Sequence, residues 1–297
     1  MSQPLLVTGA GGQLGRRVVD LLLAQGAGPL IVTTRHPEKL GELRDRGVEV
    51  RRVDFDAPAA LAEAFAGAAR LLLISTDALD RPGRRLAQHR SAIEAAVKAG
   101  VEHVVYTSLT NPGPGSPIAI ASDHQGTEDA LAESGLGATV LRNNLYTDLL
   151  LGSLQRALAT GQLVAAAGDG KTGYVTREDC ARAAAAALAA DFNGKRVLDI
   201  TGPATVSQGD IARIASELTG KPIVYVPIPR EALEQGMRQA GLPAAMATLF
   251  ASFDEGIARG TLDVATSAVE ELTGEPAEDV QRFLARHVAA LRAPVAA

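Results

Sequence analysis

Short apolar runs alternate with helical patterns through the first half of the chain. The run PLLVTG at 4–9 predicts a strand, and leucines and valines at helical spacing predict an amphipathic helix over 13–25. Five more strands are predicted at 29–35, 48–55, 70–76, 102–109 and 137–143. Helices are predicted between them over 37–47, 58–66, 84–99 and 122–134. Because each strand is followed by a helical crossover, this order predicts a parallel, doubly wound α/β sheet.

The rhythm of the chain changes beyond about residue 145. Shorter apolar runs follow at 162–167, 196–201 and 223–228, and the pattern from 229 onward is mostly helical. No internal repeat or low-complexity linker marks the change. We therefore expect residues 1–145 to form the main α/β domain. Residues 146–297 are expected to form a smaller, mainly helical C-terminal lobe that is not a strictly separate segment.

Composition narrows the range of functions. The 297 residues are 46% hydrophobic, which is typical of a folded protein with a substantial core. A net charge of −5 and an aromatic content of 3% without tryptophan argue against a nucleic-acid surface. One cysteine, Cys180, excludes internal disulfides and favours the cytoplasm. The apolar stretches are too short to cross a bilayer, so no membrane partner is expected.

Four glycines lie close together between the first predicted strand and the first predicted helix. Gly9 permits a tight turn, Gly12 lets the backbone approach a pyrophosphate, and Gly15 lets the helix pack closely on the sheet. Backbone N–H groups at the start of the helix then face the phosphates. This arrangement predicts a Rossmann-type dinucleotide site, although a glycine-rich turn without a ligand is the alternative. The residues expected at the phosphates are Gly9, Gly11, Gly12, Gln13, Leu14 and Gly15.

The end of the second predicted strand indicates which dinucleotide is bound. A site that prefers NAD usually has an acidic residue there for the ribose 2′-hydroxyl, but this strand ends in Thr33, Thr34 and Arg35. The planar guanidinium of Arg35 suits a 2′-phosphate, and His36 and Lys39 add positive charge nearby. The sequence therefore favours NADP(H), while the simpler interpretation makes Arg35 a solvated charge at a strand end.

Two further strand ends are expected to border the same cofactor, because ligands bind at the carboxyl ends of such strands. Asp54 and Phe55 follow the third strand and are candidates to flank the adenine, with Asp54 accepting from its amino group. Ser75 and Thr76 follow the fourth strand and are candidates for the ribose and nicotinamide. An ordinary turn remains the alternative at both places.

The chain resembles the NmrA-like atypical short-chain dehydrogenase/reductases, and within them the bacterial NAD(P)H:quinone oxidoreductases and triphenylmethane dye reductases. The runs that carry the likeness include TGAGGQLG, RHPEKL, QHRSAIEAA, VVYTSL, LRNNLYTD and AAGDGK, which are spread over nearly the whole chain. The resemblance implies an NADP-binding Rossmann domain and a small C-terminal domain, with the substrate in the cleft between them.

A catalytic pair that most short-chain dehydrogenases use is absent. These enzymes place Tyr-x-x-x-Lys on the helix after the fifth strand, but the matching positions here hold Ile120 and His124. Reduction of a carbonyl to an alcohol needs a positioned proton donor. A quinone yields a stabilised hydroquinone that takes protons from water, so proximity to the nicotinamide can suffice. The missing pair therefore favours a quinone or a similar planar electrophile as substrate.

Four residues are candidates for contact with substrate or for catalysis. Asn143 and Tyr146 match the LRN..Y pattern of the resemblance: Asn143 is a candidate for the nicotinamide amide or a quinone oxygen, and Tyr146 for stacking or donation. Lys171 could stabilise a developing oxyanion, and His124 could bond the ribose. Structural roles remain the alternative for all four. The histidines show no metal-ligand spacing, so no metal is expected.

Two functions from different classes fit these observations. The first is an NADPH-dependent oxidoreductase that transfers hydride directly to a quinone or similar planar electrophile. The second is a non-catalytic NADP(H) sensor that acts through a protein partner, as some NmrA-like members do. The bacterial-reductase likeness favours the enzyme. We expect a monomer or a homodimer, since the sequence does not distinguish them.

Overall fold

The computed structural model describes residues 3–293, which form two compact units interleaved along the sequence. The first unit comprises the chain up to Leu109 together with Asp123–Arg142 and Cys180–Leu198. The second comprises Thr110–Ser122, Asn143–Asp179 and the chain from Asp199 onward. The first unit therefore takes in a segment that lies well beyond residue 145.

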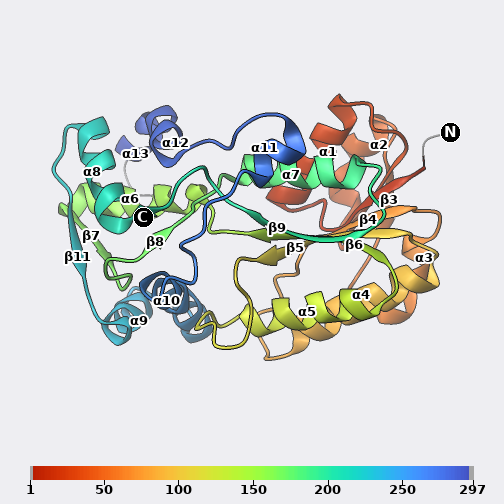
Figure 1. Ribbon diagram of the computed structural model, residues 1–297, viewed down its shortest axis with the longest axis horizontal. Coiled ribbons are helices and arrows are strands. Elements are labelled where there is room, and N and C mark those ends of the chain that lie inside the picture. Colours follow the sequence, from red (N-terminus) through yellow and green to blue (C-terminus); the bar gives the residue numbers. More distant parts are fainter. Residues whose placement is uncertain (1–2, 294–297) are drawn as a thin grey trace. The chain divides into compact units, whose positions relative to one another are not determined.

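A seven-stranded parallel sheet in the order β3-β2-β1-β4-β5-β6-β9 forms the centre of the first unit (Figure 1). The six predicted strands are all present in it, and the predicted doubly wound α/β fold is confirmed. The run at 196–201, expected in the C-terminal lobe, is instead the edge strand β9. The strands are β1 (Leu5–Val7), β2 (Leu30–Thr34), β3 (Glu49–Arg52), β4 (Arg70–Leu73), β5 (His103–Leu109), β6 (Gly137–Asn143) and β9 (Lys195–Ile200).

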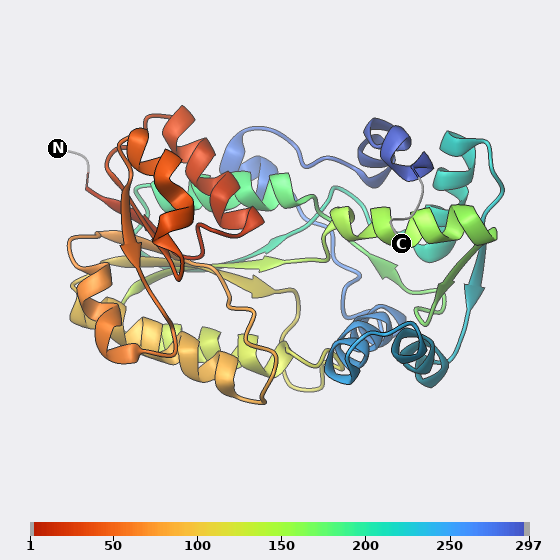
Figure 2. The ribbon, with the colours of Figure 1, turned by 180° about the vertical axis from the view of Figure 1, so that it is seen from behind.

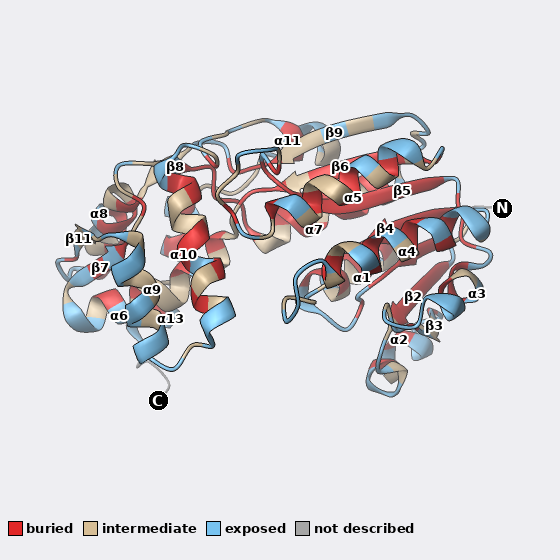
Figure 3. Cartoon of the chain, turned by 90° about the horizontal axis from the view of Figure 1, so that it is seen from below, coloured by how far each residue is buried: buried red, intermediate tan, exposed pale blue. Residues whose placement is uncertain are grey.

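Helices cover both faces of this sheet, as Figures 1 and 2 show. One face is covered by α1 (Gln13–Ala24), α2 (Gly41–Asp45) and α7 (Arg177–Ala189), and the other by α3 (Leu61–Phe65), α4 (Arg84–Lys98) and α5 (Ala121–Glu133). The central strands β1, β4 and β5 are buried along their whole length, and Figure 3 shows this for β4 and β5. Apolar runs such as 5–7 and 71–73 suit strands that are covered on both faces. The edge strand β3 is half-exposed and carries charged residues.

The second unit is mainly helical and has two small sheets. In one, β7 (Gln162–Ala165) pairs in parallel with β11 (Val224–Pro227). In the other, β8 (Lys171–Thr172) runs antiparallel to β10 (Val206–Ser207), a pairing that the sequence did not predict. Its helices are α6 (Leu150–Thr160), α8 (Gln208–Thr219), α9 (Arg230–Gln239), α10 (Ala244–Ala258), α11 (Ala268–Thr273), α12 (Val280–Arg286) and α13 (Val288–Arg292). Its core includes Leu154, Ile211, Ala215 and Leu284, all fully buried.

A buried arginine ties the late segment Cys180–Leu198 to the rest of the first unit. Arg70, at the start of β4, donates from Nε to the carbonyl oxygen of Leu188 at 2.8 Å. It also donates to the carbonyl oxygens of Ala187 and Phe192 at 3.2 and 3.0 Å. Because burial disfavours the charged form, the pKa of Arg70 is lowered. These carbonyl oxygens, together with Asn193 Oδ1 at 3.3 Å, accept from the buried guanidinium. Among residues 3–293, no helix is both long and apolar enough to cross a bilayer.

Candidate dinucleotide-binding site

The glycine loop forms a tight turn that is open to solvent. Gly9 has a φ of +64°, in the left-handed region that glycine adopts without strain. The N–H group of Gly12 donates to the carbonyl oxygen of Gly9 at 2.9 Å, which closes the turn directly before α1. Gly9, Gly11 and Gly12 are exposed, so the outer side of the turn is free to receive a ligand.

The start of α1 fits an anionic group. A Cβ atom on Gly15 would lie 2.4 Å from the carbonyl oxygen of Gly9, so only glycine allows the helix to begin this close to the turn. Gly12 caps α1 without any side-chain hydrogen bond, and the first turn carries no acidic residue. The exposed N–H groups and the helix dipole therefore favour a phosphate there. Gln13 is exposed, whereas the side chain of Leu14 packs inward, so only its backbone faces this position.

Arg35 stands at the carboxyl end of β2 with 63% of its side chain exposed. One guanidinium nitrogen lies 3.8 Å from a carboxylate oxygen of Asp77, which follows β4. Because β1 lies between β2 and β4, this loose pair spans the strand that leads into the glycine loop. His36 is paired with Glu38, and Lys39 is exposed. Arg35 is thus accessible to a phosphate at the position the sequence predicted.

Hydrogen bonds of Asp56 fix the segment that follows β3. Asp54 is exposed, and its carboxylate accepts from the N–H group of Asp56 at 3.0 Å. Asp56 in turn accepts from Arg84 through both carboxylate oxygens and from Gln88 at 2.9 Å. The hydrogen bond from Arg84 lowers the pKa of Asp56 to about 2. Phe55 packs against the core of the first unit, so Asp54 is the member of the predicted pair that faces solvent.

The segment after β4 is held by side chains. The N–H group of Ser75 donates to Thr107 Oγ1 at 2.9 Å, and that of Thr76 donates to His89 Nε2 at 3.0 Å. Ser75 and Thr76 are half-exposed, so their other polar groups remain accessible. Sequence reasoning missed Thr107 and His89. The local signal for both residues is a polar side chain at a buried position, Thr107 in β5 and His89 in α4.

Asn143 is the last residue of β6 and therefore stands at the carboxyl end of its strand. Its side chain is 6% exposed, and its Oδ1 atom has no hydrogen-bond partner. A buried amide oxygen without a partner is unfavourable unless a ligand or water satisfies it. This observation points to an external donor at Asn143.

Tyr146 and Lys171, the other residues predicted for the substrate, belong to the second unit, as Asn143 does. Tyr146 is half-buried, and the guanidinium carbon of Arg177 lies 5.2 Å from its ring centroid. Arg177 is itself held by Asp148 at 2.9 Å. Lys171 is exposed on β8. Hydrogen bonds from Ser207 are the main cause of the lowered pKa of Asp210, and the charge of Lys171 adds to them. No contact brings Lys171 and Tyr146 together.

His124, predicted as a candidate for the ribose or for catalysis, lies inside a buried network of the first unit. It is 3% exposed, and its ring nitrogens lie 2.9 Å from Tyr106 Oη and 3.0 Å from an Arg85 guanidinium nitrogen. Burial lowers the pKa of His124 well below its usual value. With both ring nitrogens engaged, its position argues against direct contact with a substrate.

Buried neutral histidines predict a loss of stability in acid. Burial lowers the pKa of His89 to about 3 and of His103 to about 4, whereas both titrate near 6.5 when unfolded. Below about pH 6.5 the unfolded chain therefore takes up protons that the folded chain does not. Each histidine then costs up to about 1.4 kcal/mol of stability per pH unit between about pH 6.5 and 4.

We expect urea unfolding at a series of pH values to show this decline. His103→Leu should make the decline shallower, and substitution of the exposed His36 by glutamine should leave it unchanged. An equal slope in all three proteins would contradict the assignment.

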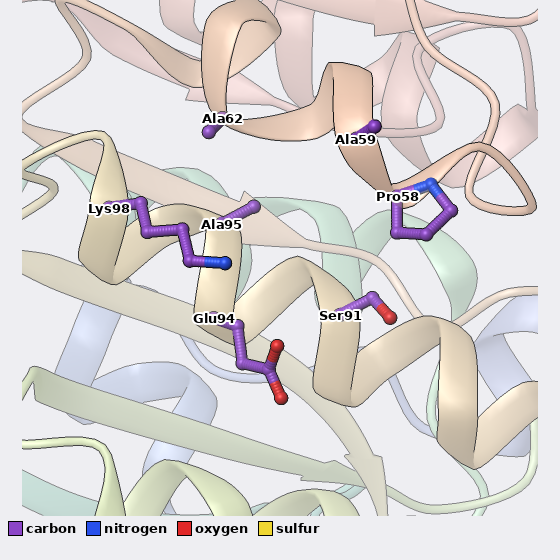
Figure 4. Close-up of a pocket in the computed structure, with 7 residues that line it drawn as sticks. All are labelled: Pro58, Ala59, Ala62, Ser91, Glu94, Ala95 and Lys98. Carbon is purple, nitrogen blue, oxygen red and sulfur yellow. The ribbon is translucent and has the colours of Figure 1, made fainter.

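A shallow cavity of about 200 Å³ lies elsewhere on the first unit, between α4 and the segment formed by the short helix Pro58–Ala60 and α3 (Figure 4). Figure 4 shows Ser91, Glu94 and Lys98 along α4 and alanines on the opposite wall. None of the predicted cofactor or substrate residues lines it. The glycine loop and the neighbouring strand ends therefore remain the candidate site.

Comparison with known proteins agrees with this site. A family model described as NAD(P)H-binding matches residues 9–191, and the chain belongs to that family. It is 36% identical over 276 residues to quinone oxidoreductase 2 of Escherichia coli strain K12, which covers 92% of this chain and 94% of that protein. The likeness to bacterial quinone oxidoreductases expected from the sequence runs is thereby confirmed.

Two solved structures resemble the whole chain. The NADPH-dependent quinone oxidoreductase of Escherichia coli in complex with NADPH gives a TM-score of 0.89 at 34% identity, covering 97% of this chain and 99% of that one. Triphenylmethane reductase of Citrobacter sp. in complex with NADP(H) gives 0.87 at 33% identity, covering 95% and 99%. Both similar proteins are oxidoreductases by name.

Proposed function

We propose that this protein is an NADPH-dependent oxidoreductase that reduces quinones or similar planar electrophiles directly, without a flavin. The observation that carries the proposal is the open glycine turn at the start of α1 together with the exposed Arg35 at the end of β2. Relatives that reduce quinones and a triphenylmethane dye support the class of substrate.

The cofactor residues divide by the part of NADPH that each would hold. The glycine turn and the first N–H groups of α1 bind the pyrophosphate, and Arg35 binds the 2′-phosphate. Asp54 accepts from the adenine amino group, and Ser75 and Thr76 offer hydroxyl groups to the ribose nearer the nicotinamide. Asn143 Oδ1, which has no partner in the protein, accepts from the nicotinamide amide.

The proposed chemistry needs little from the protein beyond positioning. NADPH, when bound, supplies the hydride. The chain holds the electrophile and excludes alternative orientations, and Tyr146 is proposed to stack on its planar ring system. Lys171 is proposed as a positive group for developing negative charge. Ile120 and the buried His124 offer no proton donor, so the reduced product takes its protons from water.

Steady-state assays test the proposal directly. Purified protein with NADPH and a panel of small quinones should consume NADPH well above the uncatalysed rate, with slower turnover on NADH. Absence of turnover with every acceptor, despite tight NADPH binding, would instead favour a redox sensor.

We also propose that the protein is located in the cytoplasm. Its single cysteine, Cys180, is buried and forms no disulfide, which suits a reducing compartment.

A further inference from the structure

The three residues after β4, Ile74–Thr76, are held in an unusual way. The strand ends at Leu73, yet each of the next three N–H groups donates to a side chain of a different element. Ile74 donates to Thr8 Oγ1 at 3.0 Å, next to the glycine loop, and Ser75 donates to Thr107 Oγ1 on β5 at 2.9 Å. Thr76 donates to His89 Nε2 on α4 at 3.0 Å. We call Ile74–Thr76 the β4 exit.

The β4 exit lies against the glycine loop. The nearest atoms to a Cβ placed on Gly9 are those of the Ile74 side chain, at 3.7 and 3.9 Å. A displacement of the β4 exit would therefore alter both the turn that faces the phosphates and the two residues proposed for the ribose. The N–H groups of the β4 exit donate to side chains and not to the backbone of a neighbouring strand. The position of the β4 exit therefore depends on these three side-chain acceptors.

His89 can accept from Thr76 only in one tautomer. Its Nε2 atom must lack a proton, so in the neutral ring the proton lies on Nδ1. That atom is 2.9 Å from Thr127 Oγ1, which donates its own proton to the carbonyl oxygen of Asp123 at 2.6 Å. Thr127 thus has only a lone pair to offer to His89, and it selects the tautomer that the β4 exit needs.

The surroundings of His89 keep the ring neutral. It is 0% exposed, and burial followed by the charge of Arg85 lowers its pKa to about 3. The Tyr106 hydroxyl lies 3.4 Å from Nδ1, and the ring of Tyr106 packs edge-on against the imidazole. His89 therefore has a fixed place and a fixed protonation state.

We propose that His89 is a positioning residue for the cofactor: through the N–H group of Thr76, it holds the β4 exit in the conformation that receives the dinucleotide. This role rests on the proposed function, since the β4 exit matters to binding only if NADPH binds there. His89 itself does not touch the cofactor. Its contribution is the preorganised backbone of the β4 exit.

Three variants and one matched control test the role. His89→Leu removes the acceptor, and we expect its dissociation constant for NADPH to rise about tenfold, as for a lost hydrogen bond to a well-placed backbone group. His89→Gln keeps an amide oxygen near the position of Nε2 and should restore binding to within about threefold of wild type. Thr127→Val keeps the imidazole but removes its tautomer-selecting partner, so its affinity should fall between the two.

The control is His103→Leu, which removes another fully buried histidine at the opposite end of β5. The Nε2 atom of His103 forms a hydrogen bond with Thr139 Oγ1 at 3.0 Å, and the ring makes no contact with the β4 exit. We expect it to lower the melting temperature about as much as His89→Leu does while NADPH affinity stays at the wild-type value. A purely structural role for His89 would make the two variants alike in both measurements.

Hydrogen exchange without any cofactor separates this inference from the proposed function. Peptides covering the β4 exit should exchange faster in His89→Leu than in His103→Leu or wild type. Equal exchange, or wild-type NADPH affinity in folded His89→Leu, would overturn the role of His89 alone. A wild-type protein that binds no dinucleotide would overturn the proposed function and, with it, the role of His89.

Discussion

Replacing Arg35 by glutamate is expected to weaken NADPH binding on the order of 100-fold, while NADH binding changes by less than about threefold. The substitution removes a charge-assisted partner of the 2′-phosphate and places a like charge beside it. NADH has no 2′-phosphate, so the same change has little to act on. Fluorescence titration of both dinucleotides gives the two dissociation constants.

The matched control is Arg213→Glu on α8, which makes the same change in net charge at a side chain that is 59% exposed. It should leave both affinities unchanged. Asp77→Asn serves as a second comparison, because it removes the carboxylate beside Arg35 and should not weaken NADPH binding. An Arg35→Glu protein with wild-type NADPH affinity would contradict the 2′-phosphate assignment.

Gly15→Ala is expected to abolish detectable NADPH binding and to lower stability by about 2–3 kcal/mol. The new Cβ atom would lie 2.4 Å from the carbonyl oxygen and 2.8 Å from the carbonyl carbon of Gly9. Both are backbone atoms, so relief requires α1 to move away from the turn. Thermal unfolding measures the loss of stability, and dinucleotide titration measures the loss of NADPH binding.

Two other glycines separate these effects. At Gly12 the nearest atom to a Cβ is the carbonyl oxygen of Gly9 at 3.4 Å, so Gly12→Ala should fold normally yet obstruct the approach of the pyrophosphate. At Gly236 inside α9 a Cβ meets nothing within 4 Å, so alanine there should leave NADPH binding unchanged and raise stability by about 0.5–1 kcal/mol. Normal NADPH binding by Gly15→Ala would mean that the helix start does not form the phosphate site.

The sheet and the glycine loop were predictable because their signals are local. A strand covered on both faces is rich in apolar residues, as β1 is, and as β4 is after Arg70. A tight turn at a helix start needs glycine where no Cβ fits, as at Gly15. The position of Arg35 followed from counting along an identified strand. Each of these inferences used only neighbouring residues.

Pairing between distant segments was not predictable in the same way. The run at 196–201 has the pattern of a half-buried strand, and nothing within it indicates whether its partner is β6 or a strand of the second unit. The network around Tyr106 has the same character, since His89 and His124 come from different helices and meet only in the folded chain. The sequence alone therefore leaves His124 a candidate for the site, and only the folded chain shows that it is buried.

The hydrogen bonds of Arg70 carry a consequence for synthesis of the protein on the ribosome. The guanidinium of Arg70 is buried, but its carbonyl acceptors at Ala187, Leu188 and Phe192 are made more than a hundred residues later. Until then the nascent sheet lacks both its last strand and the partners of a buried cation. The dinucleotide-binding unit should therefore complete its folding only after about two thirds of the chain has emerged, and NADPH should not protect shorter nascent chains from proteolysis.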